Sequence, residues 1–520
     1  MGHTPRAVVS LAALLLITAL SAHADDDDWG NISDQDWAVL APDDYPEADA
    51  VVILDKGHTD ITRDQIKSDF YIRIKILTET GVERAGNRFI TLDEHDDLKQ
   101  LDARTVLPTG EKVEVDRNAV FEKQYGPYRA MAISFPAVEP GCILEYRYTI
   151  VQDEYFHPPS WFFQGSLYVL QSEFSFAYAE NYQYNISYQH VPLVNQEPEV
   201  EELLDPRGST WFKKKILTWH MENLPPIKNE PYMSCLDDYR SSLRFQLVSI
   251  QQDHHLRRYY TTWPQLGNQY GKYLDEYCND RRKIEKLARQ VTDGLTSDIE
   301  KSEALYDYVV NDFATSSEYA FFANEKMSQM LNDKRGRGPE KNLLLAKLHQ
   351  ALNIPSWPVL ISTRNNARFD PGYPDLRQFN YIIAFVKLGD QWEFLDAANR
   401  FAPYGILPAN CLTDGGFLID GKDSKLVKMT TKPITSARID RTEMFMAGDG
   451  TVTCSTQVDL SGYYASTFAE EFEQRDEKDF LMDHFFSRLE AEYEEGEHHC
   501  RMDSLNQFVI DVSYSAPGLF

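Results

Sequence analysis

Cysteine and histidine side chains are the first candidates for chemistry in this sequence, because a thiolate with an imidazole in reach makes a nucleophilic site. No cysteine stands at the start of an expected helix with a histidine near it in the sequence, and there is no Cys-x-x-Cys pair. The thin spread of the cysteines over a large chain predicts buried free thiols, with a single disulfide as the alternative. The six cysteines are Cys142, Cys235, Cys278, Cys411, Cys454 and Cys500.

Three further candidates have the right residue types but the wrong surroundings. Cys411 lies in an expected loop without a neighbouring histidine, so we interpret it as a plain thiol and not as a nucleophile. His349 falls in the middle of an expected helix beside an apolar stripe, where a surface or packing role is favoured. His498, His499 and Cys500 carry metal-ligand chemistry, but adjacent residues on a strand point to opposite faces. We therefore expect no metal site and no cofactor.

A more specific pattern runs through residues 336–396. It consists of Gly336-Arg337-Gly338-Pro339-Glu340, an apolar stretch over 352–359, Phe379-Asn380-Tyr381 and Leu395-Asp396, with a Tyr-Gly-Ile-Leu-Pro run over 404–408 behind it. In this order and spacing the pattern resembles the core of the transglutaminase-like superfamily, which has a papain-related cysteine fold. The resemblance covers about residues 260–425.

The resemblance implies a role for three positions. Members place a cysteine at the start of a helix, where the helix dipole lowers the thiol pKa, a histidine that shares its proton, and a carboxylate that orients the histidine. Here those positions hold Gly338, Tyr381 and Asp396. Without a thiolate no thioester forms, and a tyrosine is a poor base at neutral pH. Transfer of the family roles to these positions predicts a degenerate triad without activity. Asp396 then either still serves the site or only caps the end of its strand.

The chain around this core divides by pattern into further parts. Residues 1–24 have a basic start, a short apolar run and an Ala-His-Ala cleavage site at 22–24, which predicts an export signal cleaved near Ala24. An acidic leader follows over 25–49. Residues 50–255 alternate like short strands and predict a β sandwich. Residues 50–225 resemble the β-rich domain of unknown function that precedes transglutaminase-like cores in many exported bacterial proteins, most clearly over 104–111 and 135–146.

Beyond residue 255 the spacing of apolar residues becomes helical. Ser297 and Glu300 form a capping box for a helix, and Pro339 suits the first turn of a second helix. Strands are expected over 357–362, 381–387 and 391–395, so residues 256–430 predict an α+β core. Residues 431–520 predict a C-terminal β-rich segment with a hairpin turn at 449–450, one charged helix over 466–491 and a last strand over 508–513.

Composition limits the partners. The 520 residues hold 52 Lys and Arg against 81 Asp and Glu, a net charge of −29, which argues against nucleic acid. We found no apolar stretch that predicts a transmembrane anchor. We interpret the chain as a periplasmic or secreted pseudoenzyme that binds a peptide or polysaccharide. Two alternatives stay open: a cysteine-type peptidase or acyltransferase with a non-standard nucleophile, and an envelope structural protein without a ligand cleft. The oligomeric state is open too.

Overall fold

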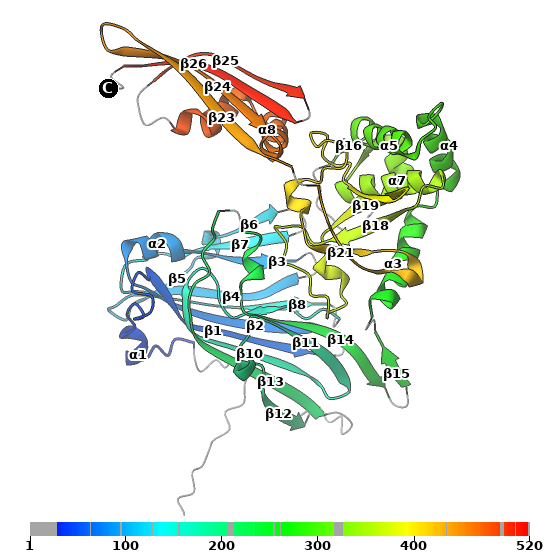
Figure 1. Cartoon of the computed structure of the whole chain (residues 1–520). Helices are drawn as coiled ribbons and strands as arrows, with labels where there is room; N and C mark the ends of the chain where they lie inside the picture. Colours follow the sequence, from blue (N-terminus) through cyan, green and yellow to red (C-terminus); the bar gives the residue numbers. More distant parts are fainter. Residues whose placement is uncertain are drawn as a thin grey trace, which may run out of the picture.

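The computed structural model describes three successive parts, a β-rich region, an α+β core and a C-terminal β-rich segment (Figure 1). It describes residues 29–517 apart from gaps at 63, 94–95, 126–127, 154–155, 205–212, 232, 253–254, 260–261, 317–325, 433, 489–492 and 505. The expected export signal and its cleavage point near Ala24 lie outside the described residues. Within them, no helix combines the length and the apolar character that a membrane crossing requires.

The β-rich region is built around one eight-stranded sheet in the order β12-β13-β10-β1-β2-β8-β4-β5. Its pairs are antiparallel except β1–β10, which is parallel. A sheet in the order β3-β7-β6 and a sheet formed by β11, β14, β15 and β9 accompany it. The strands are β1 (Ala50–Ile61), β2 (Ile66–Ile76), β3 (Asn87–Leu92), β4 (Asp96–Val106), β5 (Lys112–Glu114), β6 (Val120–Tyr125), β7 (Tyr128–Ser134), β8 (Ile143–Gln152), β9 (Trp161–Phe162), β10 (Tyr168–Ala179), β11 (Tyr182–Gln189), β12 (Glu199–Leu204), β13 (Lys213–Leu224), β14 (Ser242–Gln252) and β15 (His255–Arg258), with helices α1 (Asp34–Trp37) and α2 (Glu79–Ala85).

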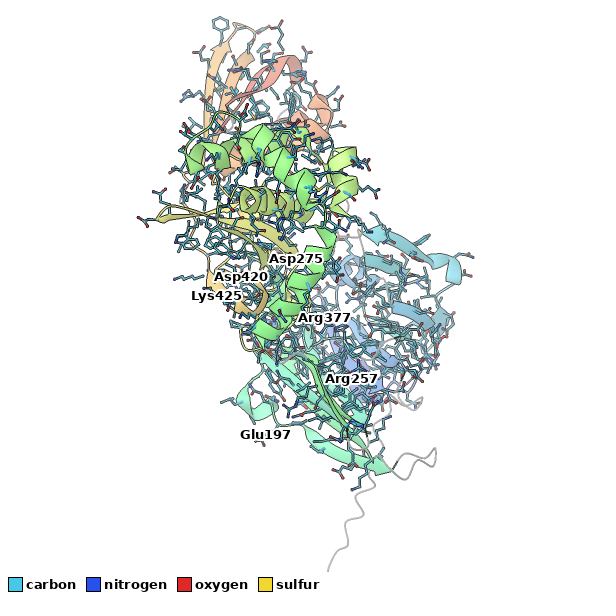
Figure 2. All side chains as sticks on the ribbon, turned by 90° about the vertical axis from the view of Figure 1, so that its right-hand side faces the viewer. Glu197, Arg257, Asp275, Arg377, Asp420 and Lys425 are labelled. Carbon is cyan, nitrogen blue, oxygen red and sulfur yellow. The ribbon has the colours of Figure 1, made fainter. Side chains whose placement is uncertain are left out.

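The α+β core packs helices on a five-stranded antiparallel sheet in the order β20-β19-β18-β21-β22. Helix α7 lies against β18 and β19 and is itself covered by α4 and α5 (Figure 1). Helix α3 lies along the sheet edge beside β22, where Figure 2 labels Asp275 on the helix and Lys425 on the strand. The elements are α3 (Trp263–Tyr277), α4 (Arg281–Val291), α5 (Asp298–Asp312), β16 (Ala314–Thr315), α6 (Met327–Asp333), β17 (Arg335–Gly336), α7 (Gly338–Ala351), β18 (Ser356–Ile361), β19 (Tyr381–Leu388), β20 (Gln391–Leu395), β21 (Gly415–Leu418) and β22 (Lys425–Lys428).

Local sequence signals explain where the two central helices begin. Ser297 is the N-cap of α5 and accepts a hydrogen bond from the Glu300 amide, while the Glu300 carboxylate accepts one from the Ser297 amide, so the predicted capping box is present. Helix α7 has Pro339 in its first turn, and Glu340 Oε2 accepts from the Arg337 amide at 2.9 Å. The helix ends before Asn353, whose φ of 60° is left-handed, a conformation that asparagine tolerates.

The C-terminal segment differs from its prediction in two elements. Its sheet has the order β23-β24-β26-β25, with strands β23 (Ala437–Met446), β24 (Thr451–Ser461), β25 (Glu494–Ser504) and β26 (Gln507–Pro517). The single helix expected over 466–491 is wrong: there are two, α8 (Tyr463–Gln474) and α9 (Glu477–His484). Arg475 is extended and Asp476 starts the second helix by accepting from the Lys478 amide. Strand β25 is the second difference: it was not predicted, because its many glutamates and histidines hide the alternation of a strand in the sequence.

Residues 71–76 of strand β2 in the large sheet are buried on both faces, although the alternation of apolar and charged residues there predicts a half-buried strand. Ile72 and Ile74 point into the main apolar core, as expected. Arg73 and Lys75 point the other way and are only 5 % and 6 % exposed. The acidic segment before the sheet lies against this face: the rings of Trp29 and Trp37 contact cationic side chains there.

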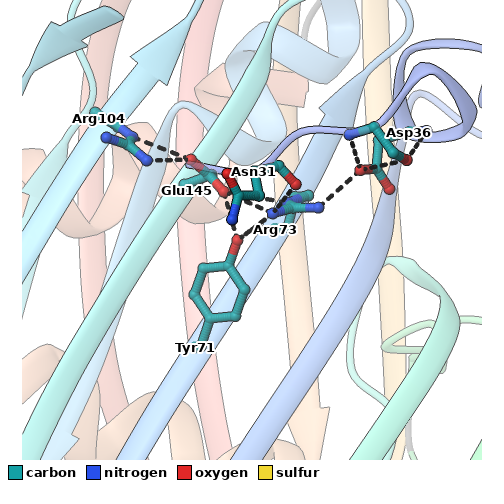
Figure 3. A network of polar contacts seen from close by, with 7 residues as sticks. Asn31, Asp36, Tyr71, Arg73, Arg104 and Glu145 are labelled. Atoms are coloured by element: carbon teal, nitrogen blue, oxygen red, sulfur yellow. Dashed lines mark hydrogen bonds and ion pairs between the residues drawn. The ribbon is translucent and has the colours of Figure 1, made fainter. Parts of the chain in front are cut away.

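The charges of Arg73 and Arg104 on this face are neutralised within the fold. Glu145 is fully buried, and its carboxylate accepts from Arg73 and from Arg104, at 3.0 and 2.8 Å in the closest contacts (Figure 3). The Tyr71 hydroxyl also donates to Glu145. Arg73 reaches on to Asp36 at 2.7 Å, which ties the acidic segment to the sheet. The carboxylate thus satisfies two guanidinium groups that would be costly to bury alone.

We predict that Glu145→Ala destabilises the β-rich region by about 3–5 kcal/mol, because it leaves two buried guanidinium groups without their common partner. Chemical denaturation measures this loss. The matched control is Glu114→Ala: Glu114 also pairs with Arg104, at 3.8 Å, but its side chain is 63 % exposed. That change should cost no more than about 1 kcal/mol. Equal losses in the two variants would contradict a special role for the buried carboxylate.

Candidate functional site

The three positions of the predicted triad lie together in the core. Gly338 is the first residue of α7, Tyr381 is the first residue of β19, and Asp396 follows the end of β20. The Tyr381 hydroxyl donates to Asp396, at 3.1 Å from Oδ1 and 3.3 Å from Oδ2. An ideal Cβ on Gly338 would stand 2.3 Å from that hydroxyl and 3.0 Å from the ring. The tyrosine therefore fills the space that any side chain at position 338 would need.

The start of β19 is fixed by the residue before it. The backbone N–H of Asn380 donates to the Ile361 carbonyl at 3.1 Å, and the side-chain Oδ1 of Asn380 accepts from the Thr363 backbone N–H at 2.9 Å. Asn380 thus joins the two ends of the loop between β18 and β19. This explains why an asparagine stands in the Phe-Asn-Tyr pattern, since its short polar side chain bonds to nearby backbone.

Asn342 is a site residue that the sequence interpretation missed. It is fully buried, and its Nδ2 donates to Asp396 Oδ1 at 2.7 Å and to the Ile382 carbonyl at 2.9 Å. Its Oδ1 accepts from the Ala397 amide at 2.7 Å. Asn342 lies four residues after Gly338, one helical turn along the same face of α7. This spacing of four residues is the sequence signal that could have identified Asn342 as a site residue.

Burial dominates the electrostatics of Asp396. It raises the pKa of the carboxyl group, although the Asn342 side chain, the Ala398 amide at 3.0 Å and the Tyr381 hydroxyl oppose this by donating hydrogen bonds to the charged form. Burial and the neighbouring carboxylate both raise the pKa of Tyr381 well above its usual value. The phenol thus remains protonated at neutral pH and serves as a hydrogen-bond donor, not as a base.

Lys341 closes the other side of the site. Its ammonium group donates to the Phe313 carbonyl at 2.8 Å and to Thr315 Oγ1 at 3.0 Å. Thr315 in turn donates to the Ala398 carbonyl, next to Asp396. Burial lowers the pKa of Lys341 to about 8. Because the ammonium group bonds to the segment that follows α5, we assign Lys341 to holding α7 against that segment.

Cys411 reaches the site from the loop after β20. Its Sγ lies 3.8 Å from Asp396 Oδ2, and the residue is 1 % exposed. Burial, followed by the charge of Asp396, raises the pKa of this thiol well above its usual value. A protonated, enclosed thiol next to a carboxylate is the opposite of an activated nucleophile.

The other cysteines and the pair His498 and His499 show no arrangement for catalysis or metal binding among the described residues. All six cysteines are free thiols, five of them buried and Cys235 half-buried. On β25, Cys500 is buried and His498 and His499 are exposed. Across the part of the chain that the structure describes, no group of three His, Cys, Asp or Glu side chains is placed to hold a metal ion.

His349 is a packing residue inside the core. It is fully buried, its Nδ1 donates to the Leu345 carbonyl, and its Nε2 lies 2.8 Å from Ser302 Oγ. Because a carbonyl can only accept, Nε2 of the neutral ring must accept from Ser302. Ser302 then accepts from the Tyr404 hydroxyl at 2.6 Å.

Two surface hollows lie away from Asp396. One, of about 590 Å³, follows the exposed side of α4 along Arg282, Lys286 and Arg289. The other, of about 280 Å³, lies between the β11–β14 strands and the loop before β19. It is lined by Gln183, Tyr184, Asn185, Gln246, Val248, Gly372 and Pro374.

Comparisons with known proteins agree with this architecture. Residues 67–228 match the model of a domain of unknown function with solved structure, DUF3857, and residues 285–397 match that of the transglutaminase-like superfamily. Both resemblances drawn from the sequence are thus confirmed. No curated protein matches the sequence.

Two solved structures resemble the chain. A "putative protease" from Parabacteroides distasonis is 12% identical, with 90% of this chain and 93% of that chain covered and a TM-score of 0.56, which shows a common fold. A "putative cysteine protease" from Cytophaga hutchinsonii is also 12% identical, covers 70% of this chain and 86% of its own, and has a TM-score of 0.21.

The buried imidazole generates a prediction on pH. Burial lowers the pKa of His349 from 6.5 to about 4 in the folded chain. The contribution of the neutral His349 ring to the free energy of unfolding is fully present above pH 6.5. It is lost as the pH falls towards 4, because His349 of the unfolded chain takes up a proton at a higher pH than His349 of the folded chain. A difference of about 2.5 pH units corresponds to about 3 kcal/mol.

Hydrogen exchange of the α7 amides at pH 7 and pH 4 measures this loss. The variant His349→Asn should be less stable at pH 7, and its deficit should shrink by about 3 kcal/mol at pH 4. A deficit that stays constant with pH would show that the ring is not held neutral.

Proposed function

We propose that this chain is an exported transglutaminase-like pseudoenzyme that serves as a binding or scaffold protein for a peptide or glycan. The observation that carries the proposal is the Tyr381 hydroxyl, which stands 2.3 Å from the position of a Cβ on Gly338 and donates to Asp396. The space of a thiol is occupied, and the orienting acid has a phenol as its partner. Export through residues 1–24, to the periplasm or the medium, is part of the proposal.

The chemistry of the site supports the absence of thioester catalysis. Gly338 offers no nucleophile, and a phenol with a raised pKa does not accept a proton at neutral pH. Nucleophile and base act as one unit, so the loss of either typically costs several orders of magnitude in rate. What remains is a closed set of hydrogen bonds, through Asn342, Tyr381 and Asp396, that connects α7 to the sheet.

A cysteine peptidase or acyltransferase is the second candidate, because Cys411 lies 3.8 Å from Asp396 and a structure of the same fold is named a protease. The raised pKa and the enclosure of this thiol count against it. An envelope structural protein is the third candidate, and the filled site is compatible with it.

The hollow between the β-rich region and the core is where we place the ligand. Its amide side chains, Gln183, Asn185 and Gln246, present both donors and acceptors without charge, as a neutral hydroxyl- or amide-rich polymer requires. Gln246 also donates to the Pro374 carbonyl, which holds the two walls of the hollow together. Its volume of about 280 Å³ is just below that of most ligand pockets, so we expect it to hold no more than one short segment of such a polymer.

We expect a thiol-directed probe to label Cys411 of the native protein far more slowly than that of the unfolded protein, by at least about 100-fold, because the reactive thiolate is suppressed by burial. Mass spectrometry of the labelled peptides measures this. Amine incorporation into glutamine-containing peptides and peptide hydrolysis should stay at background.

Cys411→Ser is the matched control, since it removes the thiol beside Asp396 and keeps a small polar side chain. Rapid stoichiometric labelling of Cys411, lost in Asp396→Ala, would overturn the pseudoenzyme and revive the peptidase. Turnover that persists in Cys411→Ser would point to another nucleophile and would overturn the proposal as well.

Binding at the hollow is tested separately with panels of short neutral oligosaccharides and of peptides. We expect one panel to bind, and Asn185→Ala to weaken the best binder by about fivefold or more, since one hydrogen bond contributes about 1 kcal/mol. Glu197→Ala is the control, an exposed change in the same region (Figure 2). No binding in either panel would favour the structural alternative.

A further inference from the structure

Strand β23 forms one edge of the C-terminal sheet. Figure 1 shows it at the opposite side of this sheet from β25, and among the described strands it pairs with β24 alone. Residues 439–446 are exposed without interruption, on both faces of the strand. Three consecutive large apolar side chains end the strand: Met444, Phe445 and Met446 are 61 %, 73 % and 62 % exposed.

The two edges of this sheet differ in a way that points to a partner. At the other edge, β25 carries Glu494, Glu495 and Glu497, and its pairing with β26 shifts register between Glu495 and His498. Charges and bulges of this kind protect an edge against pairing. The register of β23 against β24 is unbroken from end to end. β23 carries charged residues of both signs, but its edge is regular and exposed and ends in an apolar run, so it is suited to accept a further strand.

Symmetry restricts how a second copy of β23 could be that strand. Two identical edge strands extend one sheet in antiparallel fashion when a two-fold axis stands perpendicular to the sheet. Each face then continues across the junction, so a residue pairs only with a residue of the same face. The axis must therefore pass between one residue and the same residue of the other copy.

Charge selects the residue at the axis. If Asp440, Arg441 or Glu443 stood at the axis, that residue would lie opposite the identical residue of the second chain. Like charges directly opposite each other are unfavourable. With Thr442 at the axis, Arg441 pairs with Glu443 of the other copy, and the same pair recurs by symmetry. Thr442 already shares a hydrogen bond of 2.9 Å with Thr456 of β24, so the two threonines at the axis would continue a row of hydroxyl groups. An axis nearer to either end of the strand would leave more of it unpaired.

The same register makes one apolar pair on the outer face, whereas Met444 comes opposite Asp440 and Met446 opposite Arg438. Ile439, which is 47 % exposed, comes opposite Phe445 on the outer face, again twice by symmetry. An aromatic ring opposite a β-branched side chain is a favourable cross-strand pair. Residues 438–446 take part on each strand, which is nearly the whole of β23.

We propose that β23 is a self-association edge, at which two copies of this chain join their C-terminal sheets with Thr442 at the two-fold axis. The partner is a second copy, because in this register Arg441 is complementary to Glu443 in charge and Ile439 pairs with Phe445. The proposal is independent of the pseudoenzyme and of the ligand hollow.

A charge exchange on the full chain tests the pairing of residues 441 and 443. Arg441→Glu and Glu443→Arg each create two like-charge pairs, so each variant alone should dimerise at least about tenfold more weakly than the unchanged chain in sedimentation equilibrium. A mixture of the two variants should restore dimers, because positions 441 and 443 then carry two glutamates in one chain and two arginines in the other. This rescue separates the pairing between copies from damage within one chain, where Arg441 also pairs with Asp459.

A cross-link tests the axis. Thr442→Cys should give a covalent dimer with a short thiol-specific cross-linker, because residues directly opposite each other have Cβ atoms about 5 Å apart. The matched control is Thr453→Cys, an exposed position on the neighbouring strand β24, which should not cross-link. The unchanged chain, with five of its six cysteines buried, is the blank.

Restored dimers in the mixture together with a cross-link at 442 would support the proposal. A chain that stays monomeric at several hundred micromolar would overturn it. So would a dimer that withstands both charge changes or cross-links at 453 in preference to 442, since another surface would then hold the copies together.

Discussion

The core is organised by a single buried carboxylate that must be satisfied. Asp396 is 2 % exposed and accepts hydrogen bonds from the Asn342 side chain, the Ala398 amide and the Tyr381 hydroxyl. These groups come from α7, from the turn after β20 and from the start of β19. A carboxylate in such a place is costly unless its oxygens are occupied, so the three segments are held in one arrangement whether or not the site performs chemistry.

The proposed replacement of a cysteine and a histidine agrees with this constraint. The Tyr381 ring reaches Asp396 through the space over the first residue of α7. Glycine at position 338 leaves that space open, because even a Cβ would come within 2.3 Å of the hydroxyl. Gly338 and Tyr381 are therefore complementary in size, and a thiol introduced at position 338 would require the tyrosine to move.

Much of the fold could be predicted because its signals are local. The capping box at Ser297 and Glu300 and the proline in the first turn of α7 specify helix starts within a few residues. The order of the motifs likewise located Gly338, Tyr381 and Asp396. Contacts between distant segments could not be predicted in this way: nothing near Glu145 in the sequence indicates that Arg73 and Arg104 share its carboxylate.

The loop of residues 362–380 connects the site to the β-rich region. The Arg368 amide donates to Asp238 at 2.5 Å, and Ser187 donates to Asp370 at 2.8 Å, so the β-rich region holds the middle of the loop. The loop ends at Asn380, whose side chain accepts from the Thr363 amide and fixes the start of β19. The position of the Tyr381 ring thus depends on contacts made by the other region. The same loop supplies one wall of the hollow through Gly372 and Pro374, so the proposed ligand hollow and the start of β19 are built on one segment.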